Sequence, residues 1–462
     1  MKLAYSILRN QFKSRFRVLV VLLVSFWYLA MWPGRLGYDY ALAIRMIKAD
    51  QSTNWWTAFY FRFLEFSTFY GATIMVSSFI GLIALAFSLW FFLSSVVQDR
   101  RIIKKTYIAI LSTPLFGVFG VTVSHDVFQT AGIIVFLGLL IQVRKNLLSN
   151  REFILCYIFA SLCLLTVKTG FISIVILTFV LCFTKYRVFA LRCSIPIVLV
   201  TLVAQIGIGP SIIKHPGANV LLSDLKCVAQ HPEADISEQE WLTLQEFAAR
   251  KLWAEPVTCS NIDLQIKTLG ISESDVKLSN TFFMDYLNIV FKNPLIVIQA
   301  HIQKSLGALP PPFFPGPQNQ VDQNIDNPIG YGVNTALQKG PGLLHPSIDE
   351  PSVATKVKFL LPLQAIAQTL TFVVNQASWF WAWGGLWLWP ILFFYISSLR
   401  LTRVSHLFVS LLPIFLLHAG NVVLGPGPLG RYYMSTILVG VSLSISLLFS
   451  WIEEVKQREQ AN

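Results

Sequence analysis

Charged residues are scarce in this chain of 462 residues. Asp, Glu, Lys and Arg make up 13% of it, hydrophobic residues make up 54%, and the mean hydropathy is +0.59. A soluble domain carries roughly 25% charged residues, so an ordinary water-exposed fold does not fit this composition. Apolar runs of about 15–25 residues recur, which is too long for barrel strands of about 10 residues. The composition therefore predicts an all-α, polytopic membrane protein.

Several common motifs are also absent. The chain has no Cys-x-x-Cys, no GxxxxGK[ST] phosphate loop, no His-Glu-x-x-His and no internal repeat. These absences argue against a structural zinc site, a P-loop enzyme, a zinc protease and a solenoid. We predict no protein-built metal site, and we leave open a divalent cation that binds together with a substrate.

The net charge of +12 is unevenly distributed. Residues 214–355 carry nine basic and fifteen acidic residues, a net charge of −6, whereas the remainder carries +18. The basic residues lie mostly between apolar runs, which is the positive-inside pattern of a multi-spanning protein. This distribution argues against nucleic acid as a partner and predicts the lipid bilayer as one.

The apolar runs and basic connectors together predict about ten crossings. Basic clusters near residues 100–105, 144–151, 185–192 and 400–403 alternate with connectors that carry few basic residues. Residues 357–374 contain Pro362, Gln364 and Gln368 and are read as an amphipathic helix at the outer interface. This assignment puts every basic cluster and both termini in the cytoplasm.

Three domains follow from this topology. Residues 1–213 form an N-terminal bundle of about seven spans with a long first outer loop at 34–69. Residues 214–355 form a mostly helical outer domain with a Pro/Gly-rich loop at 309–350, and residues 356–462 form the interfacial helix and about three further spans. Within the outer domain, Ser237 and Glu240 fit a capping box. Cys227 and Cys259 are the only cysteines in that domain, so we expect a disulfide.

Two acids lie at predicted outer ends of helices. Asp39 follows the first apolar run in Gly37-Tyr38-Asp39-Tyr40, and Asp126 ends the short connector Ser124-His125-Asp126. Asp126 suits either a helix N-cap or an active-site role, and Asp39 suits either a solvated turn or a general base.

Cations and aromatic residues accompany these acids. Lys168 and Arg431 lie at the predicted outer ends of two helices. At that position each residue suits either an interfacial anchor or a partner for a lipid phosphate. The other candidates are Tyr38, Trp55, Trp56, Arg62, His125 and Tyr432. Two carboxylates and two cations at one membrane face suit a reaction that activates a hydroxyl beside a phosphate.

This layout resembles the polytopic GT-C-fold glycosyltransferases, and most closely the bacterial relatives of protein O-mannosyltransferases and lipid A sugar transferases. The similar features are Asp39 after the first helix, Ser124 to Phe128, Lys168-Thr169-Gly170, Asn293-Pro294 and Arg431-Tyr432-Tyr433. The chain departs from the family pattern in lacking a paired acid in the first loop and in having Thr169 where the family has Asn.

The resemblance implies an inverting enzyme of the bacterial inner membrane and cell envelope. It would move a sugar from a polyprenyl-phosphate donor to a glycan, lipid or protein acceptor on the outer face. In this assignment Asp39 and Asp126 are catalytic, and the substrate-binding residues are Tyr38, Trp55, Trp56, Arg62, His125, Lys168, Arg431 and Tyr432.

Two other function classes remain open. A transporter or flippase would use the same membrane architecture, and a non-enzymatic envelope assembly protein would use the outer domain for binding. Charged residues inside the apolar runs are scarce, which argues against a transport pathway through the bundle. Sugar transfer by the protein would distinguish an enzyme from both alternatives.

Overall fold

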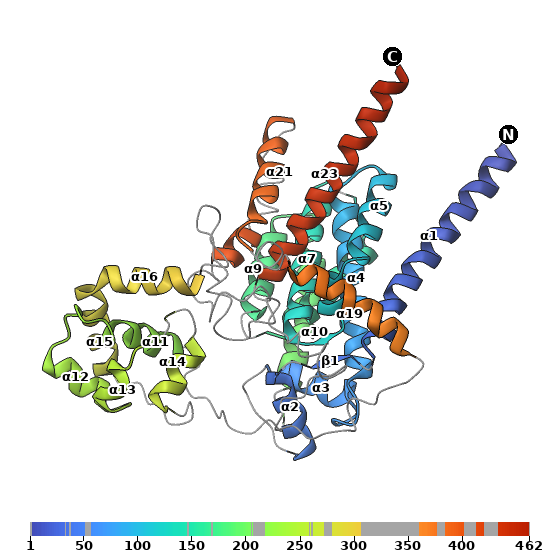
Figure 1. Ribbon diagram of the computed structural model, residues 1–462. Coiled ribbons are helices and arrows are strands. Elements are labelled where there is room, and N and C mark those ends of the chain that lie inside the picture. The colour runs from blue at the N-terminus through green and yellow to red at the C-terminus, as the bar shows by residue number, and fades with distance from the viewer. Residues whose placement is uncertain are drawn as a thin grey trace.

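A computed structural model gives the fold. It describes residues 2–32, 34–36, 38–50, 57–145, 147–167, 170–204, 206, 218–257, 259, 262–271, 280–305, 360–376, 384–401, 413–419 and 433–461. This part of the chain is predominantly helical, as the composition predicts (Figure 1).

The elements fall into three groups along the chain. The N-terminal group is α1 (Lys2–Ala30), β1 (Arg35–Leu36), α2 (Tyr38–Lys48), α3 (Ala58–Ser67), α4 (Met75–Val96), α5 (Arg100–Leu111), α6 (Pro114–Gly120), β2 (Thr122–Val123), α7 (His125–Arg144), α8 (Asn150–Leu164), α9 (Gly170–Cys182) and α10 (Arg187–Ala204). The middle group is α11 (Ala218–Ala229), α12 (Glu238–Gln245), α13 (Arg250–Ala254), α14 (Ile262–Leu269), α15 (Asn280–Lys292) and α16 (Pro294–Ser305). The C-terminal group is α19 (Leu361–Gln376), α21 (Leu388–Leu401) and α23 (Met434–Ala461).

The N-terminal and C-terminal groups share one apolar core. α4 packs along α7, α7 packs along α8, and α23 joins them through contacts with α5 and α21. Glycines allow the close approaches, because a Cβ on Gly132 would lie 3.0 Å from the Ala160 carbonyl oxygen of α8. Small residues at such contacts are typical of helix pairs in membranes, where packing replaces the hydrophobic driving force.

The connectors between helices lie at two ends of this bundle, and polar contacts identify each end. At one end, which we call the basic end, Lys105 pairs with Glu453 of α23, and Lys145 Nζ donates to the Ser95 carbonyl at 2.8 Å. At the other, the site end, Thr57 Oγ1 donates to the Leu165 carbonyl at 2.8 Å. Both chain termini lie toward the basic end, and α2 and α3 lie at the site end (Figure 1). This sorting agrees with the predicted alternation of connectors.

Among the described helices, four are long and apolar enough to cross a membrane: α4, α7, α10 and α23. Two bent pairs raise the number to six if each counts as one span, namely α5–α6 with a 64° bend and α15–α16 with a 95° bend. The described residues therefore support four to six candidate spans and do not support the predicted ten. Helices such as α8, with 15 residues, and α9, with 13, are shorter than a bilayer-spanning helix of about 20 residues.

The apolar stretch at residues 106–123 does not form one continuous helix, because the chain bends by 64° between α5 and α6. Pro114 lacks an amide hydrogen and starts α6, and the Thr113 hydroxyl accepts from the Phe116 amide as its N-cap. The indole Nε1 of Trp27 donates to the freed Leu111 carbonyl at 2.8 Å. Hydrogen bonds from side chains thus replace the helical ones at the break.

One further expectation from the sequence needs correction. The first outer loop at 34–69 is not a loop throughout, because it contains α2 and α3. Within the all-α architecture, β1 and β2 form a two-residue parallel pair that the sequence did not predict. Strands this short leave no alternating pattern in a sequence.

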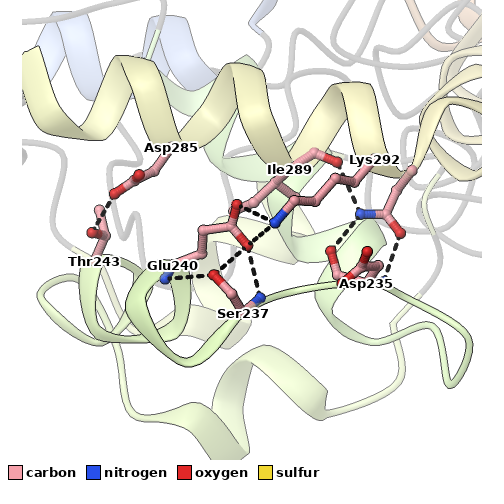
Figure 2. Close-up of polar contacts among 8 residues, drawn as sticks. Asp235, Ser237, Glu240, Thr243, Asp285, Ile289 and Lys292 are labelled. Atoms are coloured by element: carbon pink, nitrogen blue, oxygen red, sulfur yellow. Dashed lines mark hydrogen bonds and ion pairs between the residues drawn. The ribbon is translucent and has the colours of Figure 1, made fainter.

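The middle group has its own apolar core, in which Trp253, Leu222 and Phe282 are buried. At its edge, Ser237 and Glu240 form the predicted capping box, and this prediction is confirmed (Figure 2). Lys292 of α15 donates to both Glu240 carboxylate oxygens, at 2.9 and 3.0 Å. A disulfide joins Cys227 and Cys259, whose Cα atoms lie 5.8 Å apart, so α11 is linked to the segment before α14.

Asn293 lies at the 95° bend between α15 and α16. Its side chain accepts from the Asp235 amide at 2.8 Å and donates to the carbonyls of Asp235 and Ile289, both at 2.9 Å (Figure 2). Pro294 then starts α16, where its missing amide hydrogen costs no helical bond. The Asn-Pro pair therefore sets the turn of the chain at this point.

Replacing Gly117 by Ala should destabilise the bundle. A Cβ at this position would lie 1.9 Å from the buried Trp27 ring, so the ring or α6 must shift, at a cost of about 1–3 kcal/mol. Thermal unfolding in detergent should give a lower Tm for Gly117→Ala than for the control Val21→Ala, whose side chain is exposed. Equal Tm values for the two variants would contradict the packing of Trp27 on α6.

Candidate functional site

The parallel strand pair aligns the starts of two helices. Arg35 pairs with Thr122 and Leu36 with Val123, and each strand leads directly into a helix, α2 or α7. Asp39 is the second residue of α2, and Asp126 is the second residue of α7. Acids are favoured there because a helix N-terminus carries partial positive charge. The fold thus gives the two predicted acids equivalent backbone positions at the site end.

Gly34 makes this alignment sterically feasible. Its φ of +130° lies in a region that side chains rarely adopt, and a Cβ there would lie 1.8 Å from the Ser78 hydroxyl of α4. The chain can therefore leave α1, pass close to α4 and enter β1 only with a glycine at this position.

A hydrogen-bonded network surrounds Asp126. The Ser124 hydroxyl donates to Asp126 Oδ2 at 2.9 Å and accepts from the Asp126 amide at 3.0 Å. His125 Nε2 lies 3.3 Å from Asp126 Oδ1, and His125 Nδ1 lies 2.8 Å from the Tyr40 hydroxyl. The Ser124 hydroxyl also contacts the Tyr40 hydroxyl at 3.0 Å. The network therefore joins α2 to α7 through side chains as well as through the strands.

Ser124, not Asp126, is the N-cap of α7. The helix begins at His125, so Asp126 lies inside its first turn and the N-cap interpretation of Asp126 is wrong. The Asp126 side chain is nevertheless only 7% exposed, and its oxygens accept from Ser124 and face His125. A buried carboxylate with this support is held in one orientation.

Tyr60 of α3 brings a hydroxyl without a hydrogen-bond partner among the described residues. The residue is fully buried, and its ring lies 5.8 Å from the His125 ring and 6.1 Å from the Tyr40 ring, centroid to centroid. Burial, and secondarily the charge of Asp126, raise the pKa of Tyr60 well above its usual value. The hydroxyl therefore stays protonated inside the protein.

The structure describes only some of the predicted site residues. The backbones of Tyr38 and Asp39 lie in the first turn of α2, but their side chains lie outside the described part. Trp55, Trp56, Lys168, Arg431 and Tyr432 also lie outside the described residues.

Arg62 has structural contacts of its own. Its guanidinium pairs with Glu65 at 2.6 Å and donates to the Ile206 carbonyl, just beyond α10, at 2.9 Å. These contacts fasten α3 to the end of α10, and they occupy the cation that we had assigned to substrate.

Sequence reasoning missed Tyr40, Tyr60 and Ser124 as partners of the acids. Tyr40 belongs to the same Gly-Tyr-Asp-Tyr segment as Asp39, and a tyrosine immediately after the acid was the available signal. Tyr60 gives no such signal, because only the folding of α3 against α7 brings it to His125.

A second polar cluster is buried in the middle group. Asp224 of α11 accepts from Lys304 at 2.6 Å, from Tyr286 at 3.2 Å and lies 3.2 Å from His301 Nε2. Burial would raise the pKa of Asp224, but the His301 hydrogen bond and the Lys304 charge outweigh it and hold that pKa below its usual value. Because Asp224 and Lys304 are almost fully buried and saturate each other, we assign this cluster a structural role.

The middle group also contains a cavity of about 470 Å³ beside the disulfide. Its polar lining comes from Gln230, His231, Gln299 and Gln303, and it contains no carboxylate. The three amide side chains suit a neutral, hydroxyl-rich molecule, and the His231 imidazole is the only side chain of this lining that could act as a general base.

Among the described residues, no group of three or more His, Cys, Asp or Glu side chains is placed to hold a metal ion. Comparison of the chain with protein-family models, curated proteins and solved structures finds no match.

Tyr60→Phe should leave stability unchanged, because it removes a hydroxyl without a described partner. Tyr40→Phe should lower the free energy of unfolding by about 1–3 kcal/mol, because it removes the contacts with Ser124 and His125. Thermal unfolding of both variants in detergent measures the difference. Equal destabilisation would mean that Tyr60 has a structural partner.

Lys304→Met should destabilise the middle group by about 3–5 kcal/mol, because it leaves the buried Asp224 carboxylate without its cation. The control Lys292→Met breaks a partly exposed pair with Glu240 and should cost at most about 1 kcal/mol. Limited proteolysis of the membrane-bound protein measures the loss of stability of the middle group. If the double variant Asp224→Asn/Lys304→Met is no more stable than Lys304→Met, the uncompensated charge is not the cause.

Proposed function

We propose that the protein is an inverting glycosyltransferase that takes its sugar from a polyprenyl-phosphate donor. The observation that carries this proposal is the parallel pairing of β1 with β2, which gives Asp39 and Asp126 equivalent positions in adjacent helix starts. Two acids at one bundle end, beside a buried protonated hydroxyl on Tyr60, suit activation of an acceptor hydroxyl.

The reaction uses a single displacement. Asp39 accepts the proton of the acceptor hydroxyl. At the same time the oxygen of that hydroxyl attacks the anomeric carbon of the donor sugar. The bond from that carbon to the phosphate oxygen breaks, and polyprenyl phosphate leaves with both electrons of that bond. Asp126, held by Ser124 and His125, orients the acceptor or a cation, and Lys168 and Arg431 bind the phosphate.

The membrane arrangement belongs to the same proposal. The protein crosses the bacterial inner membrane about ten times, with both termini in the cytoplasm and the site end outside. The clustering of Lys105, Lys145 and Glu453 contacts at one end supports this orientation. α19 lies at the outer interface, and its contacts with α6, the short helix that leads to β2 at the site end, support that assignment.

A membrane site fits the donor, because each CH₂ of a polyprenyl chain moved into water costs about 0.8 kcal/mol. The site end adjoins the ends of the apolar helices, so a lipid-linked sugar can reach it from the side while its chain stays in hydrocarbon. The acceptor binds between the site end and the middle group.

Asp39→Asn should lower transfer by about 10²–10⁴-fold, the range for loss of a general base. Asp126→Asn should also lower it, with a larger effect on acceptor KM because this acid orients the acceptor. The control is Asp50→Asn, an exposed acid just beyond the end of α2. The assay measures transfer from a panel of labelled polyprenyl-phosphate sugars in membranes with matched protein levels.

Wild-type transfer by Asp39→Asn would remove Asp39 from the mechanism. Movement of the labelled lipid across the membrane without any transfer product would instead support a flippase.

A further inference from the structure

An apolar stripe covers the outward side of α15 and α16. Its members are large hydrophobic side chains, each 39–79% exposed: Phe283, Met284, Leu287, Phe291, Leu295, Ile298 and Ile302. Met284, Leu287 and Phe291 are spaced by three and four residues, as are Leu295, Ile298 and Ile302, and Phe283 adjoins Met284. Each set therefore lies on one face of its helix. Phe291 and Leu295, the most exposed, flank the 95° bend, so the stripe continues from one helix to the next.

The opposite faces of both helices fix this orientation. Phe282 and Ile289 of α15 are buried in the core of the middle group, and so are Val297 and Ala300 of α16. Lys304 adds a buried ion pair with Asp224 of α11 on the same inner face. The stripe residues cannot turn inward without breaking that pair, so the fold of the domain keeps them exposed.

Charge is segregated across the domain. On α15 and α16 in the described part, Lys292 is exposed and Asp285 is partly exposed, and both contact α12, Lys292 through Glu240 and Asp285 through Thr243. Exposed acids lie instead on and beside α12 and α13, including Glu238, Glu246 and Glu255. A domain that rests on a lipid surface needs an apolar side without acids and a polar side toward water.

The chain itself holds this domain near the bilayer. Thirteen residues separate the end of α10 from the start of α11, a reach of at most about 50 Å when fully extended. In Figure 1, α16 forms the side of the domain that faces the same way as the basic end of the bundle, and α12 and α13 form the opposite side. α16 also runs crosswise to α1 and α23, which is the direction of a helix lying in the membrane plane (Figure 1).

We propose that α15 and α16 form an interfacial anchor, with the apolar stripe embedded in the lipid headgroup region beside the bundle. The bent pair therefore lies on the bilayer and does not cross it. A helix in this position sinks its apolar face about 5–10 Å below the surface. This inference uses none of the residues of the proposed transfer reaction, so it stands or fails separately from that function.

Lipid-dependent quenching tests the anchor in the full-length protein. The four unpaired cysteines are replaced by alanine, the disulfide is kept, and an environment-sensitive fluorophore is attached at Phe291→Cys or Ile298→Cys. The matched control is Leu242→Cys on α12, an apolar side chain that is 58% exposed on another element. The protein is reconstituted into phosphatidylcholine vesicles with or without doxyl-labelled lipid.

Doxyl lipid should quench both stripe labels at least about twofold more than the Leu242→Cys label, given the expected depth of the helices. Adding Leu295→Glu should reduce quenching at Ile298→Cys while the gel-filtration profile stays unchanged. Equal quenching at the stripe and at Leu242→Cys would overturn the proposal. Efficient cross-linking between Leu295→Cys residues of two copies, with no lipid quenching, would overturn it in favour of a second copy of the chain.

Discussion

The pairing of β1 with β2 is the constraint on which the candidate site depends. A strand pair with two residues in each strand is not stable by itself, and the surrounding core of α1, α4 and α7 holds it in place. Because the strands run in parallel, both helices that follow start at the same end. That geometry brings Tyr40 within hydrogen-bonding reach of Ser124 and His125, and it orients the dipoles of α2 and α7 toward one region.

Different interactions stabilise the bundle and the middle group. In the bundle, glycines such as Gly132 let helices approach closely, and side-chain donors such as the Trp27 indole repair broken backbone hydrogen bonds. The middle group is built as a small water-exposed domain, with a disulfide, a capping box and the buried Asp224–Lys304 pair around its core. In our proposal, the interfacial anchor on α15 and α16 is the part of this domain that contacts the lipid.

The sequence predicted features that leave a local signature. Helical character, the basic connectors, the Ser237–Glu240 capping box and the approach of Cys227 to Cys259 all depend on composition or short spacings. Contacts that only the tertiary fold creates were missed, including the strand pair and the approach of Tyr60 to His125. The contact of Arg62 with the Ile206 carbonyl was missed for the same reason, because Ile206 is far away in sequence. Pro114 was a visible signal for the helix break, but hydropathy alone merged α5 with α6.

The alignment of the two helix starts is tested most directly by cross-linking across the strand pair. Leu36→Cys with Val123→Cys, in a protein whose unpaired cysteines are alanine, should form a disulfide rapidly in native membranes, since paired strand residues lie about 5 Å apart. Leu36→Cys with Val96→Cys, at the far end of α4, should remain reduced. Cross-linking of the first pair that is no faster than that of the second would contradict the shared site.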